Sequence, residues 1–141
     1  MKLKLLSLFI AAVIVCFLIA AFSFYRIFRS STARGTTATV ANRVMWAGFE
    51  LPASAADVTY YVDFGGCEAE FAISEADFLS WCSDRGWTVT KIDTPVPYFK
   101  PILLPDDDHL VQHGYTFSLP DGDGVYDAST SRAAFHVSTF P

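Results

Sequence analysis

The sequence VTYYVDFGGCEAEFAI, residues Val58–Ile73, decides the fold because it contains two strands and the turn that joins them. Apolar side chains recur at every second position on both sides of Gly65-Gly66, which is the pattern of a β-hairpin closed by a two-residue turn. If Phe64 pairs with Cys67, the other apolar side chains meet on one face and the charged ones fall on the opposite face. The stretch therefore predicts an antiparallel sheet with one buried face.

The residues that follow carry the signals of a short helix. Ser74 and Asp77 form a Ser-x-x-Asp capping pattern, and Gly86 is typical of the position just past a helix end. The apolar stripe between these signals consists of Phe78, Leu79, Trp81 and Cys82. We therefore expect a helix that ends before Gly86 and packs on the apolar face of the sheet.

Further alternating segments complete the predicted sheet. Trp87–Ile92 is expected to form a third strand, and Tyr115–Leu119 alternates apolar and polar residues. Asp121–Gly124 supplies a turn that leads into Val125, and Ala133–Ser138 alternates again. The predicted fold class is α+β: an N-terminal transmembrane helix followed by a small antiparallel sheet of about six strands, with a β-hairpin and then one helix packed on the sheet.

Leu5–Tyr25 is an apolar run of 21 residues without a formal charge. As a helix it would be about 31 Å long, which matches the ~30 Å hydrocarbon layer of a bilayer. Arg26 and Arg29 follow directly and form an interfacial border of the kind that retained anchors carry. We therefore predict that residues 1–29 are a transmembrane signal anchor whose partner is the lipid bilayer. The alternative is a secretory signal cleaved near Ser23.

The rest of the chain is predicted to form a short tether and one domain. Residues 30–48 begin with the small polar sequence SSTARGTTA and are expected to be a juxtamembrane linker and lead-in. Residues 49–141 are expected to form the α+β domain. Basic residues flank the apolar run on both sides, so their distribution gives no clear orientation. An apolar segment this near the amino terminus is typical of a signal anchor, which predicts a single-pass membrane protein with its C-terminal domain outside the cytoplasm.

Charge is divided unevenly along the chain. The first 34 residues contain five of the 10 basic residues and no acidic residue. The remaining residues therefore carry five basic and 15 acidic side chains, a net charge of −10. A domain with this charge repels phosphate backbones, so we exclude nucleic acid as a partner.

A proline-rich segment, Asp93–Pro105, interrupts the strand pattern with four prolines and a high apolar content. Proline cannot donate to a sheet ladder, so this segment is expected to be an extended loop. Two outcomes are open: the loop packs over the core, or it presents an apolar surface to a protein partner. In the second case the interaction loop consists of Tyr98, Phe99, Ile102, Leu103 and Leu104.

The acidic segment Asp106–His113 offers a weaker signal for a metal site. His109 and His113 are spaced i, i+4, which on a helix would place both imidazoles on one face, and Asp106 and Asp108 add carboxylates. The glycine that follows would end such a helix at once, and no paired Cys/His motif accompanies the cluster. We therefore predict no metal and no cofactor, and keep these four residues as the alternative metal set.

Cys67 and Cys82 are expected to be free thiols. The rises of a strand and of a helix place their Cα atoms about 14 Å apart, beyond the ~7 Å limit for a disulfide. Free cysteines of this kind are usually buried as small apolar side chains.

The sequence offers no catalytic motif, and a functional prediction has to start from the anchor and the domain. A nucleophile elbow, a phosphate-binding loop and a dinucleotide fingerprint are all missing. We expect a membrane-anchored, non-enzymatic interaction or assembly module at the cell envelope. The alternative is a small-ligand or metal-binding sensor, or a hydrolase, that uses the Asp106–His113 cluster.

Overall fold

The computed structural model describes residues 13–21, 30–99 and 109–138. Residues 13–21 are helical, and the rest of the predicted membrane span Leu5–Tyr25 lies outside the described residues. Within the described ranges no helix has both the length and the apolar content needed to cross a membrane. The membrane anchor and the localisation therefore stay predictions.

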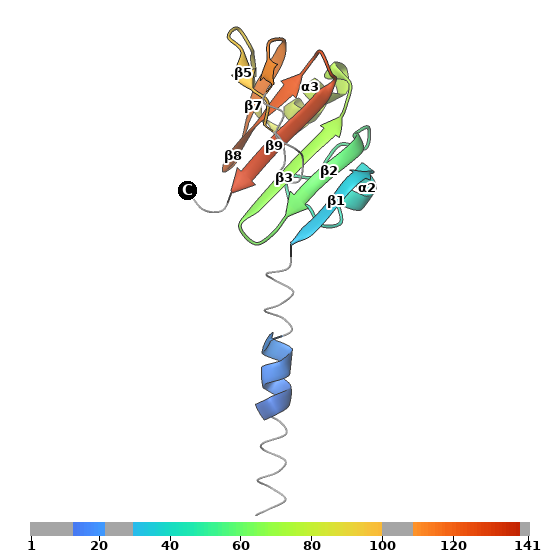
Figure 1. The fold of residues 1–141 in the computed structure, drawn as a ribbon, viewed down its shortest axis with the longest axis vertical. Coiled ribbons are helices and arrows are strands. Elements are labelled where there is room, and N and C mark those ends of the chain that lie inside the picture. The colour runs from blue at the N-terminus through green and yellow to red at the C-terminus, as the bar shows by residue number, and fades with distance from the viewer. Residues whose placement is uncertain (1–12, 22–29, 100–108, 139–141) are drawn as a thin grey trace, which may run out of the picture.

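An antiparallel sheet forms the body of the domain (Figure 1). The strands are β1 Ser31–Thr36, β2 Ala56–Val62, β3 Gly66–Ala72, β4 Thr88–Lys91, β5 Val96–Pro97, β6 Leu110–Val111, β7 Gly114–Leu119, β8 Gly122–Asp127 and β9 Arg132–Ser138, and the helices are α2 Ala38–Ala41 and α3 Glu75–Arg85. In the described part of the chain, seven strands pair in the order β1-β2-β3-β9-β8-β7-β4, and β5 pairs with β6 in a separate two-stranded sheet. All of these pairings are antiparallel, so the prediction of an antiparallel sheet with few helices is confirmed, with more strands than the expected six.

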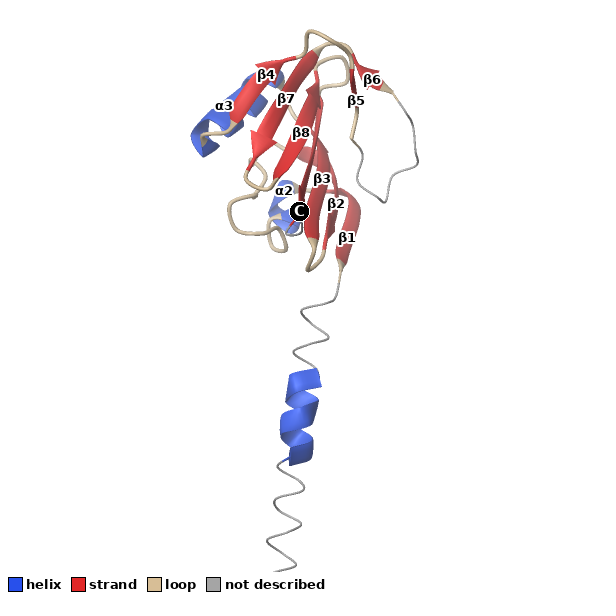
Figure 2. Cartoon of the chain, turned by 90° about the vertical axis from the view of Figure 1, so that its left-hand side faces the viewer, coloured by secondary structure: helices blue, strands red, loops and turns tan. Residues whose placement is uncertain are grey.

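Different elements cover the two faces of the large sheet (Figure 2). α3 lies on one face, and the β5–β6 ribbon lies on the other. In the central strand β9, Ala133, Phe135 and Val137 belong to the core under α3, whereas Ala134 packs with the ribbon. We call these the helix face and the ribbon face of the sheet.

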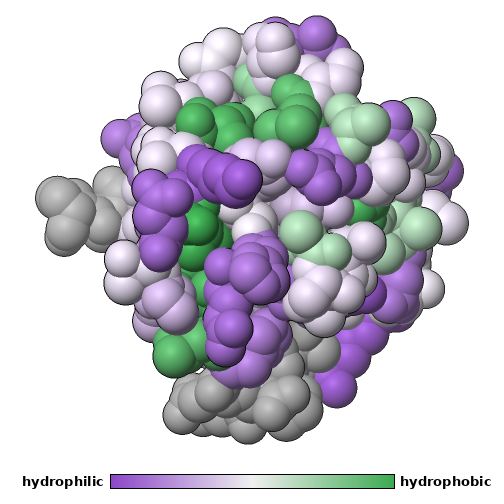
Figure 3. All heavy atoms as spheres, turned by 90° about the horizontal axis from the view of Figure 1, so that it is seen from above, coloured by the Kyte–Doolittle hydropathy of each residue, from purple (hydrophilic) through white to green (hydrophobic). Residues whose placement is uncertain are grey.

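The two ends of the sheet also differ. At the end that is uppermost in Figure 1, Asp127 at the close of β8 pairs with Arg132 at the start of β9, beside Ala72 of β3. At the lower end, Ser31 at the start of β1 pairs with Val62 at the close of β2. Figure 3 looks down on the upper end, where hydrophilic residues are spread among smaller hydrophobic areas.

Aromatic side chains fill the helix face. Phe78 of α3 stacks on Tyr126 with ring centroids 4.6 Å apart and meets Phe117 edge-on at 5.2 Å. Trp81 meets Phe71 edge-on at 5.5 Å. All five side chains are buried, so this face forms the main apolar core of the domain.

The predicted helix is confirmed, including both of its ends. α3 begins after Ser74, whose hydroxyl oxygen accepts a hydrogen bond from the Asp77 N–H at 3.2 Å. Gly86 closes it in the left-handed conformation with φ of 68°, which glycine adopts without the steric penalty of a Cβ atom. The buried residues of the predicted stripe are Phe78, Trp81 and Cys82.

The segment predicted as a tether is partly a strand. Ser31–Thr36 forms β1 and pairs with β2 at the edge of the sheet. Threonines and small residues show little apolar alternation, but they suit an edge strand, which has one side open to solvent. Six residues of the segment predicted as a juxtamembrane linker, 30–48, therefore belong to the sheet, and α2 adds a short helix at Ala38–Ala41.

The hairpin forms where it was predicted, but with a different register. Val62 pairs with Cys67, so the turn is centred on Phe64 and Gly65. Asp63 explains the change, because its carboxylate accepts hydrogen bonds from the N–H groups of both turn glycines at 2.8 Å. From Thr59 to Val62 each residue thus meets a partner two positions away from the predicted one, which leaves the two faces unchanged, and an irregularity between Ala56 and Thr59 shifts the register once more.

The predicted turn at Asp121–Gly124 is shorter in the structure, because β8 already begins at Gly122. A Cβ atom at Gly124 would lie 2.3 Å from the ring of Phe117 and 2.7 Å from the backbone oxygen of Ala134. Glycine is therefore required inside this strand, where it admits an aromatic ring from the neighbouring strand.

Cys67 and Cys82 are fully buried free thiols, as predicted. Burial raises the pKa of Cys67 to about 11 and that of Cys82 to about 12. Both thiols therefore stay protonated at neutral pH and act as small apolar side chains.

Candidate functional site

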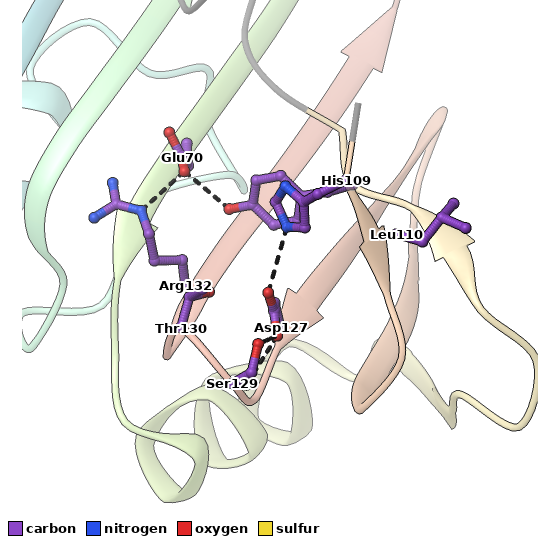
Figure 4. A pocket seen from close by; sticks show the side chains of 8 residues that line it. Glu70, His109, Leu110, Asp127, Ser129, Thr130 and Arg132 are labelled. Carbon is purple, nitrogen blue, oxygen red and sulfur yellow. Dashed lines mark hydrogen bonds and ion pairs between the residues drawn. The ribbon is translucent and has the colours of Figure 1, made fainter. Parts of the chain in front are cut away.

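A pocket lies between the ribbon face of the sheet and the β5–β6 ribbon, near the upper end (Figure 4). It has a volume of about 340 Å³ and is partly open to solvent. Strands β3, β8 and β9, the turn after β8, and the ribbon with Tyr98, His109 and Leu110 form its walls. The described residues that line it are Glu70, Tyr98, His109, Leu110, Asp127, Ser129, Thr130 and Arg132.

Strand register brings the charged residues of this pocket together. Asp127 and Arg132 are paired across β8 and β9. Arg132 also pairs with Ala72 of β3, and Glu70 lies two residues before that position on the same face. Residues far apart in the sequence therefore lie close together, because the three adjacent strands that carry them reach the same end of the sheet.

Glu70 is a buried carboxylate that accepts two hydrogen bonds from side chains. Its own side chain is 7% exposed, and Oε1 accepts from Arg132 Nε at 2.8 Å and from the Tyr98 hydroxyl at 3.0 Å. Arg132 also donates from Nη1 to Asp57 Oδ2 at 2.8 Å. Burial opposes the charge on Arg132, but the hydrogen bonds to Glu70 and Asp57 prevail and raise its pKa. The negative charge of Glu70 is thus balanced within the protein.

Tyr98 connects the ribbon to the main sheet. Its buried ring stacks on His109 with centroids 4.6 Å apart, and its backbone N–H donates to the His109 carbonyl at 3.0 Å. Burial, followed by the negative charge of Glu70, raises the pKa of the Tyr98 hydroxyl. This hydroxyl therefore keeps its proton at neutral pH and holds the ribbon against β3 as a hydrogen-bond donor.

Asp127 is also buried, with 3% of its side chain exposed. Ser129 donates to Oδ1 twice, from its backbone N–H at 2.8 Å and from its hydroxyl. Burial favours the neutral acid, but the hydrogen bonds from Ser129 and Thr130 outweigh it and lower the pKa of Asp127. The carboxylate is therefore ionised at neutral pH, and Ser129, which donates to Oδ1, carries no charge.

His109 lies beside Asp127 at ion-pair distance, and Figure 4 draws this contact as a dashed line. Nε2 lies 3.4 Å from Asp127 Oδ2, and this buried nitrogen has no hydrogen-bond partner in the part of the chain that the structure describes. A buried polar atom without a partner costs about 1–3 kcal/mol. A ligand group that forms a hydrogen bond with Nε2 would therefore gain binding free energy by removing this cost.

The predicted interaction loop is described only in part. Tyr98 lies in the pocket wall, and Phe99 is half-buried with its ring centroid 5.5 Å from that of His136. Both side chains contact other residues of the domain. The remaining members, Ile102, Leu103 and Leu104, lie outside the described residues, so the contact surface stays a prediction.

The alternative metal set assumed that His109 and His113 share one face of a helix, and the structure places neither of them on a helix. His109 and His113 flank the strand β6 instead of lying on a helix, and Asp106 and Asp108 are outside the described residues. His109 lines the pocket described above, whereas His113 lines a separate hollow of about 210 Å³. Among residues 13–21, 30–99 and 109–138, no group of three or more His, Cys, Asp or Glu side chains is placed to hold a metal ion.

Sequence reasoning missed the charged core of the site. Glu70 alternates with apolar residues in β3, which predicts a solvent-exposed side chain, and its burial depends on the distant ribbon that folds over it. Asp127 and Arg132 flank a short turn between two alternating segments, so the sequence does hold a signal that they pair across a hairpin. The pattern gives no sign that this hairpin lies beside β3.

No protein-family model, curated protein or solved structure matches this chain. Function therefore has to be inferred from the geometry of the pocket and from the sequence.

Proposed function

We propose that this chain is a membrane-tethered binding protein whose pocket takes a small ligand with a protonated amino group. The observation that supports this most directly is the pair formed by Asp127 and His109. An ionised, buried carboxylate lies 3.4 Å from an imidazole nitrogen that has no hydrogen-bond partner among the described residues, in the wall of a partly open pocket. An ammonium group donates several hydrogen bonds from a single nitrogen atom, so it can satisfy Oδ2 and Nε2 together.

The charge balance of the pocket favours a cation. The positive charge of Arg132 balances the negative charge of Glu70, and the same guanidinium group also forms an ion pair with Asp57. Asp127 is stabilised by neutral donors from Ser129. When His109 is neutral, the pocket therefore keeps a net negative charge, and it belongs to a region of the chain that is strongly acidic.

The pocket also has an apolar side. The stacked rings of Tyr98 and His109 form one wall, and Leu110 lies beside them. A cation next to an aromatic face gains about 0.5–2 kcal/mol from the ring quadrupole. The volume of about 340 Å³ lies at the small end of the range for small-molecule sites. We therefore expect a small amine with a short apolar body.

The order of the hydrogen bonds supports binding without hydrolysis. In a Ser–His–Asp triad the imidazole accepts the proton of the serine. Here the hydroxyl of Ser129 donates to Asp127, and His109 faces the other oxygen of the same carboxylate. The arrangement does not activate Ser129 as a nucleophile.

The tether is the part of the proposal that comes from the sequence. Leu5–Tyr25 is long and apolar enough for a single membrane span, and its position near the amino terminus favours a domain outside the cytoplasm. A protein-contact module remains the alternative, but its surface depends on Ile102, Leu103 and Leu104. The pocket is better supported because eight residues that line it are described, whereas Ile102, Leu103 and Leu104 are not.

Titration with three four-carbon probes tests the proposed ligand class. Butylamine, 1-butanol and butyrate share an apolar body but carry a positive, neutral and negative head group at neutral pH. In NMR spectra of the ¹⁵N-labelled full chain in detergent micelles, butylamine should shift the amide signals of His109, Ser129 and Thr130. Butanol should shift them weakly and butyrate not at all. Shifts of equal size from butyrate would rule out a cation site.

Two aspartates of β8 provide matched variants for this titration. Asp127 and Asp123 lie on the same face of the strand, but Asp123 is exposed and does not line the pocket. Asp127→Asn should weaken butylamine binding roughly tenfold, because a charge-assisted hydrogen bond is lost. Asp123→Asn should leave the affinity unchanged. If both variants bind the amine as tightly as the wild type, the pocket is not the site.

A further inference from the structure

The lower end of the sheet receives the chain from the predicted membrane anchor. Ser31 opens β1 and lies opposite Val62, the last residue of β2. The β2–β3 turn begins directly after Val62, so its apex at Phe64 lies at the same end of the sheet as Ser31, the lower end in Figure 1. This turn and the start of β1 therefore share one end of the domain, and the pocket lies at the other end.

The connection between the predicted span and the sheet is short. Five residues separate Tyr25, where the apolar run ends, from Ser31. The six steps between these residues cover at most about 22 Å when extended and about 9 Å when helical. The headgroup layer outside the hydrocarbon core adds roughly 5–7 Å on each side of a bilayer. If Leu5–Tyr25 spans the membrane, as the proposed function holds, the turn lies close to the bilayer surface.

The turn itself has the chemistry of a membrane contact. Phe64 is 50% exposed at the apex, a position where turns usually carry small or polar residues. The neighbouring charge is engaged within the turn, because Asp63 accepts hydrogen bonds from the N–H groups of Gly65 and Gly66 and from the Tyr61 hydroxyl, each at 2.8 Å. The apex therefore presents an aromatic ring next to a carboxylate that is already hydrogen-bonded.

We propose that Phe64 inserts into the interfacial layer of the same bilayer that holds the anchor of this chain. Aromatic rings favour this layer, and the anchor already holds the turn beside it. The inference rests on the membrane tether of the proposed function and extends it, because a second contact fixes the orientation of the domain. The lower end of the sheet then lies on lipid, and the pocket at the upper end faces away from the membrane.

Tryptophan placed at either end of the sheet tests this orientation. Phe64→Trp marks the turn, and Leu110→Trp is the matched control, because Leu110 is 57% exposed and lines the pocket at the upper end. Both variants of the full chain are reconstituted in phosphatidylcholine vesicles with bromine on the upper part of the acyl chains. After subtraction of the wild-type signal, the tryptophan at position 64 should be quenched at least twofold more than the tryptophan at position 110. Equal quenching at the two positions overturns the inference.

Two further measurements make the test decisive. Flotation of the vesicles after a carbonate wash reports on the tether alone. A chain that floats but shows no excess quenching in the Phe64→Trp variant keeps the tether and loses the Phe64 contact, whereas a chain that does not float loses both. In the wild-type chain, a gadolinium-labelled lipid headgroup should broaden the amide signal of Phe64 and not that of Leu110, so the conclusion does not depend on how the variants fold.

Discussion

The helix face and the ribbon face of the sheet use the same strands for different purposes. On the helix face, Phe71, Phe78 and Trp81 pack ring against ring with almost no exposed surface. On the ribbon face, Glu70 and Asp127 are buried under a small two-stranded cover and beside an open pocket. The comparison indicates that one face supplies most of the apolar packing of the fold, while the other face buries the charged residues of the proposed ligand site.

The energetics of the two faces support this division. Full burial of a large apolar side chain stabilises the folded state by about 1.5–3 kcal/mol. Each buried aromatic ring of the helix face therefore adds to the stability of the fold. A buried carboxylate must first lose its hydration, and its hydrogen bonds do little more than offset that loss. Substitutions on the ribbon face should therefore be mild unless they leave a charge without its partner.

The largest effect is expected from Phe78→Ala on the helix face. The ring is fully buried and stacked on Tyr126, so its removal should lower the free energy of unfolding by about 3–5 kcal/mol. Leu110→Ala is the matched change on the ribbon side, and it should cost less than about 0.5 kcal/mol because Leu110 is exposed. Urea titration followed by tryptophan fluorescence measures both values. Similar losses of unfolding free energy in the two variants would contradict the claim that the helix face contributes most of the stability.

A smaller effect should follow when Glu70 loses its partner. Arg132→Met leaves the buried carboxylate without its guanidinium group, and we expect a loss of about 1–3 kcal/mol, because Arg132 is itself 24% exposed and partly screened by solvent. Adding Glu70→Gln to this variant should recover part of the loss, because the unpaired charge is removed. A double-mutant cycle by urea unfolding checks the coupling. Strictly additive losses would mean that the pair is not coupled.

Asp127→Asn should show the pH dependence of the ribbon face. The pKa of Asp127 is lowered in the folded chain, so its stabilising contribution is complete above its unfolded pKa, near pH 4, and disappears as the pH falls through the folded pKa. At pH 7 the variant should be less stable by about 1–2 kcal/mol. The difference should shrink in urea unfolding series below pH 4. A constant difference from pH 7 to pH 3 would show that ionisation of Asp127 does not matter.

The smallest effect concerns the helix that covers the core. Ser74→Ala removes the side-chain cap of α3 and should cost about 1 kcal/mol. Thr37→Ala removes the corresponding cap of α2, where the contact is 3.4 Å long and the helix has four residues, so it should cost less. Thermal unfolding of the two variants measures the stability that each one loses. A larger loss at Thr37 would contradict the expectation that the shorter cap contact on the longer helix contributes more to stability.

Local signals account for most of what the sequence predicts correctly. Ser74 and Gly86 define α3 because caps act on the neighbouring backbone, and alternation identified β2 and β3 and their faces. The register of the hairpin differs by two positions because Asp63, a side chain outside the pattern, decides which residues form the turn. Ser31–Thr36 was missed as a strand because an edge strand needs no apolar alternation.

The pocket was harder to predict because no local signal encodes it. Glu70 becomes buried only when the ribbon β5–β6, from a proline-rich segment, folds across the sheet. Tyr98 was predicted as a contact residue on aromatic character alone, while its actual neighbours, His109 and Glu70, lie in other elements. Recognition of the site requires the order of β3, β9 and β8, which depends on long-range pairing.

The most direct test of the account locates a bound amine within the molecule. In the full chain saturated with butylamine, intermolecular nuclear Overhauser effects should connect the methylene protons of the probe with the ring protons of Tyr98 and His109. Asp127→Asn should abolish these contacts, and Asp123→Asn should preserve them. Contacts with a different region of the domain, or unchanged contacts in the Asp127→Asn variant, would show that the buried carboxylates of the ribbon face do not form a ligand site.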